Sequence, residues 1–310
     1  MKAVAYYAYG GPEVMRLADL PEPVLRPGYA VVKVAAASIN PVDWKLRGGI
    51  LRLIMGKKFP RVMGADVAGT IHAVAEGSDF KIGQKVFGFA PPADPPGSLA
   101  EYCLVPLDRL AALPTGLSFA EAAAIPCVGV TAYQALVTQG HVEAGQHVLI
   151  NGCTGGIGHF AVQIAKAHGA HVTGTCRTSL MDFATSLGVD KVVDYTRENI
   201  LDSAQRFDVI LETSSTLPFR KARRIMKPGG VFLDPDLNIL NTPLGLFGRR
   251  YRSVSADIRR GVMETLGAMA ERGQLKPVVG QQVPLDEAIA AITAIENGAS
   301  VKGKAIFTVG

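Results

Sequence analysis

Residues 151–160, NGCTGGIGHF, contain four glycines within the first eight positions and directly follow the apolar run HVLI at 147–150. The run predicts a buried strand, and residues 156–168 predict a helix. This order is typical of a dinucleotide site, because glycines allow a tight turn, close approach of the backbone to a pyrophosphate and, at Gly158, close packing of the helix. The helix N-terminus adds N–H groups and partial positive charge for that anion. We expect cofactor contacts here, rather than a ligand-free glycine turn, from Gly152, Thr154, Gly155, Gly156 and Ile157.

The surrounding residues alternate between strand-like and helical stretches from Ser118 to Asp257. Strict alternation predicts right-handed βαβ units around a parallel sheet. The first helix is expected to start at SFAEAAA, with Ser118 as its N-cap and Glu121 completing a capping box. After the glycine loop and its helix we expect strand 171–177, helix 179–188, strand 191–195, strand 207–213, helix 217–230 and strand 231–236, with residues 249–255 closing the series.

The two ends of the chain differ in character from this middle part. Up to about Pro114, short β-type runs are separated by glycine and proline, which predicts a compact, mostly β domain. After Asp257 come two helical stretches and a final strand, KGKAIFTVG, of the same β type as the start. We therefore expect the tail to rejoin the first domain. The expected divisions are 1–117 for the first part of that domain, 118–257 for the α/β domain and 258–310 for the returning part.

Composition and charge exclude several classes of protein. The net charge of +5 is small and spread along the chain, and no basic segment is interleaved with aromatic residues, so a nucleic-acid partner is not expected. The most apolar stretch, 120–137, is broken by Pro126 and Gly129, so no membrane span is expected. The start lacks the pattern of a secretory signal peptide. Four widely spaced cysteines fit thiols in a reducing compartment, and the expected location is the cytoplasm.

The strand at 171–177 decides between NAD and NADP. An NAD site usually places Asp or Glu near the end of the second strand, where it bonds the ribose 2′-hydroxyl. Here the strand ends in Gly174 and Thr175, followed by Arg177 and Thr178, with no carboxylate among them. A guanidinium binds a phosphate through two parallel hydrogen bonds. We therefore expect NADPH, with Thr175, Arg177 and Thr178 near its 2′-phosphate; an ordinary exposed arginine is the alternative for Arg177.

Motifs along the whole chain resemble those of the medium-chain dehydrogenase/reductase superfamily: NPVDW (40–44), GADVAG (64–69), GSLAEY (97–102), AIPCVGVTAYQAL (124–136), NGCTGGIGHFAVQIAK (151–166) and KPGG (227–230). Within the superfamily the chain resembles the zinc-free quinone oxidoreductase branch, which includes enone reductases. The resemblance implies an α/β fold with a GroES-like, β-rich catalytic domain and a Rossmann dinucleotide-binding domain built on a parallel six-stranded sheet. It also implies a nicotinamide cofactor in the cleft between the domains, and a homodimer formed through the Rossmann sheets.

The same resemblance bears on metal binding. In the zinc-dependent alcohol dehydrogenase branch, a cysteine, a histidine and a later cysteine hold catalytic zinc. This chain has Asn40 and Ala65 at the first two positions, and only Cys127 falls at the third. One thiol does not supply the three protein ligands that catalytic zinc needs. No metal site is expected, and the resemblance implies a zinc-independent enzyme.

The expected substrates are therefore quinones or α,β-unsaturated carbonyl compounds (enones). Hydride adds to a conjugated position of these acceptors, and hydrogen bonds alone can support the charge that spreads to an oxygen. The resemblance implies that Asn40 orients the substrate oxygen; the alternative is that Asn40 only holds the turn before Pro41. We take Asn40 and Asp43 as the catalytic candidates, with water or two further side chains, Lys45 and Tyr102, as alternative proton donors. The apolar residues expected in a pocket wall, or alternatively in the core, are Leu53, Ile54 and Phe59.

Further cofactor contacts follow from matching motifs. Thr131 resembles a threonine near the nicotinamide, and Tyr195 resembles a tyrosine beside the adenosine phosphate. Thr213 and Ser214 end a strand at the edge where such a sheet meets its ligand. Pro235 is also a candidate, although its segment DPDLN departs from the small residues usual there. Two other functions stay open: a zinc-free alcohol or aldehyde dehydrogenase-like enzyme, and a non-catalytic NADPH-binding protein of the same fold.

Overall fold

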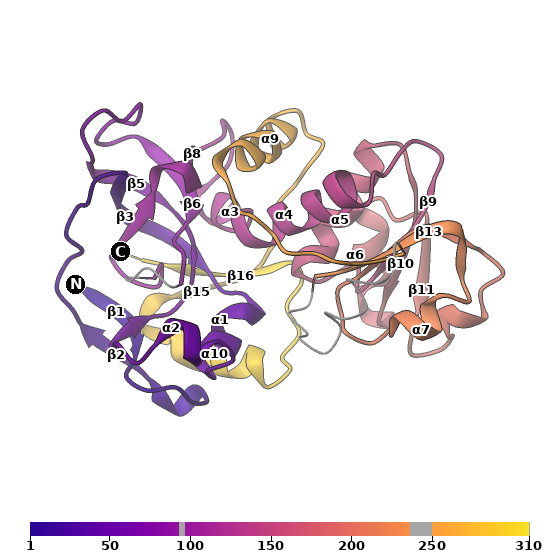
Figure 1. Cartoon of the computed structure of the whole chain (residues 1–310), viewed down its shortest axis with the longest axis horizontal. Coiled ribbons are helices and arrows are strands. Elements are labelled where there is room, and N and C mark those ends of the chain that lie inside the picture. The colour runs from indigo at the N-terminus through magenta and orange to yellow at the C-terminus, as the bar shows by residue number, and fades with distance from the viewer. Residues whose placement is uncertain (93–96, 236–249, 310) are drawn as a thin grey trace. The chain divides into compact units, whose positions relative to one another are not determined.

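The computed structural model describes residues 1–92, 97–235 and 250–309 (Figure 1). The chain divides into two compact units. The first unit comprises Met1–Cys127, Ile258–Glu271 and Pro277–Gly310. The second unit comprises Val128–Asp257 and Arg272–Lys276. In the described residues, no helix is both long enough and apolar enough to cross a membrane.

A parallel sheet forms the centre of the second unit. Among the described residues it has six strands, in the order β11-β10-β9-β12-β13-β14. They are β9 (His147–Asn151), β10 (His171–Cys176), β11 (Lys191–Asp194), β12 (Phe207–Glu212), β13 (Met226–Asp234) and β14 (Tyr251–Ser253). The chain builds outward from β9 to β11 and then crosses to β12 on the other side of β9, so the strand order reverses at β9. This is the order of a Rossmann sheet, and it confirms the predicted fold.

Helices connect consecutive strands, as βαβ units require: α5 (Gly156–Ala167) follows β9, α6 (Met181–Ser186) follows β10 and α7 (Phe219–Ala222) follows β12. Helix α4 (Pro126–Tyr133), which continues into the π-helical turn η3 (Gln134–Gln139), precedes β9. Short 3-10 turns are η4 (Thr178–Leu180) and η5 (Ile200–Asp202). Helix α5 packs on β9 and β10, and α6 packs on β10 and β11.

The predicted helix over 217–230 is wrong in extent. Helix α7 covers only Phe219–Ala222, and β13 has already begun at Met226. Pro228 lacks a backbone N–H and Gly229 adopts a positive φ of 79°, so neither residue supports a helix here. The strand pairs with β12 through a register shift between Phe207 and Val209, which accommodates this irregular start.

The first unit is mostly β-structure, as predicted. A three-stranded sheet has the order β2-β1-β4, and a larger sheet has the order β15-β16-β3-β5-β6-β8, with β7 also pairing to β3. The strands are β1 (Lys2–Tyr6), β2 (Met15–Asp19), β3 (Tyr29–Ser38), β4 (Arg61–Val62), β5 (Asp66–Val74), β6 (Lys85–Phe89), β7 (Tyr102–Pro106), β8 (Leu110–Ala112), β15 (Val279–Pro284) and β16 (Lys304–Thr308). The helices are α1 (Pro41–Arg47), α2 (Arg52–Met55), α3 (Phe119–Ala123), α9 (Arg260–Glu271) and α10 (Ala288–Glu296), with 3-10 turns η1 (Pro12–Val14), η2 (Leu107–Arg109) and η7 (Leu285–Glu287).

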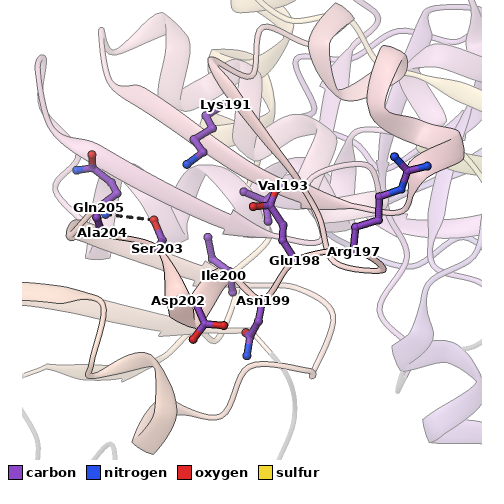
Figure 2. Close-up of a pocket in the computed structure, with 10 residues that line it drawn as sticks. All are labelled: Lys191, Val193, Arg197, Glu198, Asn199, Ile200, Asp202, Ser203, Ala204 and Gln205. Atoms are coloured by element: carbon purple, nitrogen blue, oxygen red, sulfur yellow. Dashed lines mark hydrogen bonds between the residues drawn. The ribbon is translucent and has the colours of Figure 1, made fainter.

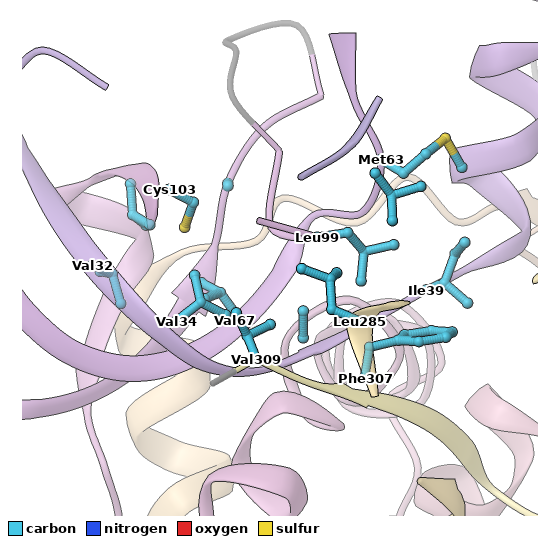
Figure 3. Close-up of a cluster of buried hydrophobic side chains, with 14 of the residues drawn as sticks. Val32, Val34, Ile39, Met63, Val67, Leu99, Cys103, Leu285, Phe307 and Val309 are labelled. Atoms are coloured by element: carbon cyan, nitrogen blue, oxygen red, sulfur yellow. The ribbon is translucent and has the colours of Figure 1, made fainter. Parts of the chain in front are cut away.

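Strand β16, near the end of the chain, pairs antiparallel with β3 near its start, with Ile306 opposite Ser38. Figure 3 shows the apolar core that this pairing helps to close, in which Val34 of β3, Val67 of β5 and Phe307 of β16 are buried together. Helix α3 of the same unit packs against β3 and β5, and its capping box forms as predicted. Ser118 Oγ accepts from the Glu121 N–H at 3.2 Å, and the Glu121 carboxylate accepts from the Ser118 N–H at 2.9 Å.

Candidate functional site

At two positions of the glycine loop in the second unit, only glycine fits without a clash. Gly152 has a φ of +88°, and a Cβ there would lie 2.7 Å from Thr213 Oγ1. A Cβ at Gly158 would lie 2.1 Å from the Gly152 carbonyl oxygen. The first turn of α5 therefore packs directly on the loop, as the motif predicts.

The N-terminus of α5 is open to an anion. Gly155 is the N-cap and no side chain caps the helix, and the first bond of the helix joins the His159 N–H to the Gly155 carbonyl. The N–H groups of Gly156 and Ile157 thus have no acceptor within the helix. A Cβ at Gly155 would meet nothing closer than 3.6 Å, so space remains in front of these donors. The loop has the donors and the room that a pyrophosphate requires.

Behind the loop, hydroxyl groups from neighbouring strands hold its start in place. Thr175 Oγ1 donates to Asn151 Oδ1 at 2.6 Å and accepts from the Gly152 N–H at 2.9 Å. Thr213 Oγ1 donates to the Asn151 carbonyl oxygen at 2.7 Å. Ser214 Oγ donates to Glu212 at 2.9 Å. Three residues predicted to contact the cofactor, Thr175, Thr213 and Ser214, thus stabilise the start of the loop through hydrogen bonds.

Asn151 and Glu212 are central to the hydrogen bonds that hold the start of the loop, and neither residue was predicted from the sequence. Asn151 Nδ2 donates to Glu212 Oε2 at 2.8 Å, and both side chains are buried. The Glu212 carboxylate also accepts from the backbone N–H groups of Ser214 and Leu217. The available signal is that each residue is polar, ends its strand and directly follows three apolar residues, VLI before Asn151 and VIL before Glu212. Such positions in parallel strands face the ligand edge of the sheet.

The residues predicted for the 2′-phosphate lie at the ends of β10 and β11. Arg177 directly follows β10 and is exposed, and the described residues give its guanidinium no partner. Tyr195 directly follows β11 and is 56% exposed. Thr178 Oγ1 donates to the carboxylate of Asp194, the last residue of β11.

Asp194 is a carboxylate beside this position that the sequence analysis did not consider, because it belongs to the neighbouring strand. It accepts from the N–H and the hydroxyl of Thr196, at 2.9 and 2.7 Å, and it pairs with Arg197 at 3.5 Å. The hydrogen bond from Thr178 is the main cause that lowers the pKa of Asp194, which is therefore ionised. Its negative charge is partly balanced by Arg197 and by these donors.

In the first unit, a buried polar cluster surrounds the start of α1. Asn40 is the N-cap of the helix and is 1% exposed, and its backbone N–H donates to Asp43 Oδ2 at 2.7 Å. Its side-chain Nδ2 donates to Asp66 Oδ2 at 2.8 Å. Its Oδ1 accepts from Lys304 Nζ at 2.6 Å. The structure thus joins the two catalytic candidates, Asn40 and Asp43, through the backbone of one helix turn.

Asp66 connects this cluster to two further elements. Its Oδ2 accepts from Ser38 Oγ at 2.8 Å, and its Oδ1 accepts from the Cys127 N–H at 2.8 Å. The positions compared above with zinc ligands, Asn40, Ala65 and Cys127, therefore meet around the Asp66 carboxylate. Asp66 and Lys304 were missed in the sequence, although each is a single charge in an otherwise apolar strand, which is unusual for a buried position.

Burial controls the protonation of this cluster. Loss of water around Asp43, aided by the nearby charge of Asp66, raises its pKa from an ordinary 3.8 to about 7, although the Asn40 N–H and Lys304 act in the opposite direction. Burial, again aided by Asp66, raises the pKa of the Cys127 thiol well above its usual value. Cys127 is therefore a neutral thiol near neutral pH. Within the described parts of the chain, no three His, Cys, Asp or Glu side chains gather as a group that could hold a metal ion.

The remaining candidates lie in varied surroundings. Lys45 is half-buried in α1, and the Tyr102 ring lies 4.9 Å from the His72 ring, tilted by 60°. Leu53 and Ile54 on α2 are 95% and 81% exposed, so they are not core residues. The other predicted residues are Phe59, packed against the Tyr6 and Tyr9 rings, buried Thr131 in α4, buried Thr154 in the glycine loop and half-buried Pro235 after β13. The rest of the DPDLN segment, from Asp236 on, lies outside the described residues.

A cavity of about 720 Å³ opens elsewhere on the second unit, beside β11 and η5 (Figure 2). Its charged lining mixes Lys191 and Arg197 with Glu198 and Asp202. It contains none of the residues predicted for the cofactor or the reaction. We therefore treat the glycine loop of the second unit and the Asn40 cluster of the first unit as two separate candidate sites.

Two sequence families match the chain. The alcohol dehydrogenase GroES-like domain matches residues 26–115, and the zinc-binding dehydrogenase family matches residues 187–306. A quinone oxidoreductase from Pongo abelii is 32% identical, with 99% of this chain and 97% of that protein covered. A 2-methylene-furan-3-one reductase from Solanum lycopersicum is 33% identical, with 99% and 79% covered. The solved structure of the quinone oxidoreductase from Coxiella burnetii has a TM-score of 0.92 at 29% identity, with 100% of this chain and 99% of that chain covered.

Proposed function

This chain belongs to the quinone oxidoreductase branch of the medium-chain dehydrogenase/reductase superfamily, an NAD(P)-binding family, and we propose that it is an NADPH-dependent, zinc-independent reductase of quinones or enones. The observation that carries the proposal is the uncapped N-terminus of α5 behind the Gly152 turn, in a sheet of Rossmann order. The names of the relatives support the acceptor class, since one is a quinone oxidoreductase and another reduces a methylene-furanone.

We assign the cofactor contacts in three groups. The pyrophosphate would bind the loop residues Gly152, Thr154, Gly155, Gly156 and Ile157. The 2′-phosphate would bind near Thr175, Arg177, Thr178 and Tyr195, where Arg177 is exposed and has no competing partner among the described residues. The nicotinamide would lie near Thr131, Thr213, Ser214 and Pro235. When bound, NADPH supplies the hydride of the reaction.

The acceptor would be oriented by Asn40. Asp66 accepts from one of the two N–H groups of the Asn40 side chain, and the Asp43 carboxyl lies close enough to the same amide for that contact to lower its pKa. In this proposal, the oxygen of the acceptor takes the second N–H in place of Asp43 as negative charge develops on it. Asn40 and Ala65 offer no side chain that binds zinc well, so the hydrogen bond takes the place of a Lewis acid in this proposal.

Asp43 is our proton donor. A carboxyl group with a pKa of about 7 holds a proton on part of the molecules at neutral pH, and such a value suits a general acid. As the hydride forms a C–H bond on the acceptor, the electron pair moves to the carbonyl oxygen. That oxygen then takes a proton from Asp43, directly or through water, and solvent reprotonates the carboxylate.

The test is a panel of acceptors with purified protein. We expect loss of NADPH absorbance with quinones or enones and little with saturated ketones, because only conjugated acceptors spread the charge without a metal. The variant Asn40→Ala should lower kcat roughly 100-fold, the size typical for loss of one such donor. Binding of NADPH without turnover of any acceptor would favour a non-catalytic protein and reject the proposal.

We also propose a homodimer that forms through the Rossmann sheet. Strand β14 pairs on one side with β13 and is an edge strand of the described sheet, with Arg252 at its centre. An edge strand has backbone groups available for a partner strand. Light scattering after size-exclusion chromatography would measure the mass, and a monomer at working concentration would reject this assembly.

A further inference from the structure

The ammonium group of Lys304 is buried at the centre of the Asn40 cluster. Lys304 is 4% exposed and begins β16, 264 positions along the chain from Asn40. Its Nζ donates to Asn40 Oδ1 at 2.6 Å and to the Ile39 carbonyl oxygen at 2.7 Å. It also lies 3.6 Å from Asp66 Oδ2. A buried lysine is costly unless it is paired and hydrogen-bonded, and these three partners meet that requirement.

We propose that Lys304 is a positioning residue that, together with Asp66, fixes which way the Asn40 amide points and hence where its second N–H is directed. This inference rests on the function proposed above, because it concerns the group that is to orient the acceptor. Lys304 itself touches neither acceptor nor cofactor in the proposal. It acts through Asn40.

The argument starts from the symmetry of an amide group. The oxygen and nitrogen of an Asn side chain have nearly the same shape, and only their partners determine which of two orientations is adopted. At Asn40 the oxygen faces the Lys304 ammonium and the nitrogen faces the Asp66 carboxylate. A flipped amide would place N–H groups against an ammonium and an oxygen against a carboxylate. Both contacts would be repulsive, so the two charges select one orientation.

The same ammonium also acts on Asp43. Lys304 lowers the pKa of this carboxyl, against the larger effect of burial. The charge of Asp66 on β5 also raises the pKa of Asp43. The charge of Asp43 in turn raises the pKa of Tyr6 on β1 and of Cys127 on α4. Removal of the ammonium should therefore raise the pKa of Asp43 further and extend its protonated form to higher pH.

The experiment replaces Lys304 by Met, which keeps the length of the stem and removes the charge. We expect kcat with the best acceptor to fall roughly 30-fold, since a misdirected donor loses most of its effect, with the KM for NADPH unchanged. The descending limb of the kcat profile against pH should move to higher pH. The matched control is Lys302→Met, an exposed lysine two residues earlier, which should leave kcat unchanged.

A second variant separates positioning from stability. Lys304→Met alone leaves the Asp66 carboxylate buried without its cation, which destabilises the fold. The double variant Lys304→Met/Asp66→Asn removes both charges, and its Tm should recover toward the wild type while kcat stays low. Recovery of kcat together with Tm would overturn the proposal, because Lys304 would then act only on stability. The single variant Asp66→Asn provides the reference.

Two NMR measurements keep this inference separate from the proposed function. The side-chain amide signals of Asn40 should be sharp and distinct in the wild type and should change in Lys304→Met, and the carboxyl titration of Asp43 should move to higher pH. Unchanged signals for both groups would overturn the proposal. Failure of the wild type to reduce any acceptor would reject the proposed function alone, because neither measurement depends on turnover.

Discussion

Arg47 and Glu296 form a bidentate ion pair that joins α1 to α10. The Arg47 guanidinium is fully buried, its Nη2 donates to the two Glu296 carboxylate oxygens at 2.8 and 2.6 Å, and the Glu296 side chain is 22% exposed. Since Asn40 caps α1 and Asp43 lies in its first turn, this pair anchors the helix that presents both candidate catalytic residues.

We predict that Glu296→Gln lowers the free energy of unfolding by about 3 kcal/mol, because it leaves a buried guanidinium without its counter-charge. Urea denaturation would measure the change. The control is Glu264→Gln, which affects an exposed pair with Arg260 and should change the free energy by less than about 0.5 kcal/mol. Equal losses of unfolding free energy in both variants would show that burial of Arg47 does not increase the contribution of its ion pair to stability.

We predict that Gly158→Ala abolishes tight binding of NADPH and lowers Tm. A Cβ at this position would lie 2.1 Å from the Gly152 carbonyl oxygen, so either the loop or α5 must move. Gly261→Ala, at a helical position with no atom within 4 Å, is the matched control and should stabilise α9 by about 0.5–1 kcal/mol. Cofactor fluorescence titration and thermal melting would provide the two readouts.

We predict that Arg177→Ala weakens NADPH binding roughly 10- to 100-fold and leaves NADH binding nearly unchanged, as expected for loss of hydrogen bonds to a charged phosphate. Arg197→Ala is the informative comparison. Because Arg197 balances Asp194, its removal should weaken NADPH binding only slightly. Equal effects of Arg177→Ala on both cofactors would remove Arg177 from the phosphate site.

We predict that Asp43 makes the fold less stable as the pH rises. Its folded pKa of about 7 lies above the ordinary 3.8, so the folded state holds a proton that the unfolded state has lost in this range. The stabilising contribution is full below the unfolded pKa and is lost as the pH rises through the folded one. Urea midpoints from about pH 5 to about pH 8 should therefore fall more steeply for the wild type than for Asp43→Asn. Parallel curves would contradict a raised pKa at this carboxyl.

We predict that chelators leave turnover unchanged and that the purified protein carries no stoichiometric zinc. The reason is the donor set: Asn40 and Ala65 contribute no good zinc ligand, and burial keeps the Cys127 thiol neutral. Elemental analysis and activity after dialysis against a chelator would measure both. One zinc per chain, with activity lost on its removal, would overturn the zinc-independent chemistry.

Local patterns in the sequence predicted local features of both units well. The glycine loop between β9 and α5 in the second unit and the Ser118 capping box in the first depend on residues within a few positions of one another, and both formed as expected. The one clear error in extent, the helix over 217–230, came from reading basic and apolar residues as helical where Pro228 and Gly229 favour an irregular strand.

The polar clusters could not be derived in the same way. Lys304 and Asn40 meet only because β16 pairs with β3, and Asp194 reaches Thr178 only because β10 and β11 are neighbours. No periodicity or short motif in the sequence indicates which strands will pair. What the sequence does carry is the anomaly of a single charged residue in an otherwise uncharged strand that is buried, and Asp66 and Lys304 both show it.

The pairing of β16 with β3 has a consequence for synthesis. Asn40 is translated 264 positions before Lys304, the cation that compensates Asp66. Any chain that stops before Lys304 would have to bury a carboxylate without its counter-charge, or leave this part of the β-structure open to solvent. Incomplete chains should therefore be recognised by proteases at the first unit, while the second unit, whose last described sheet strand ends at Ser253, survives digestion.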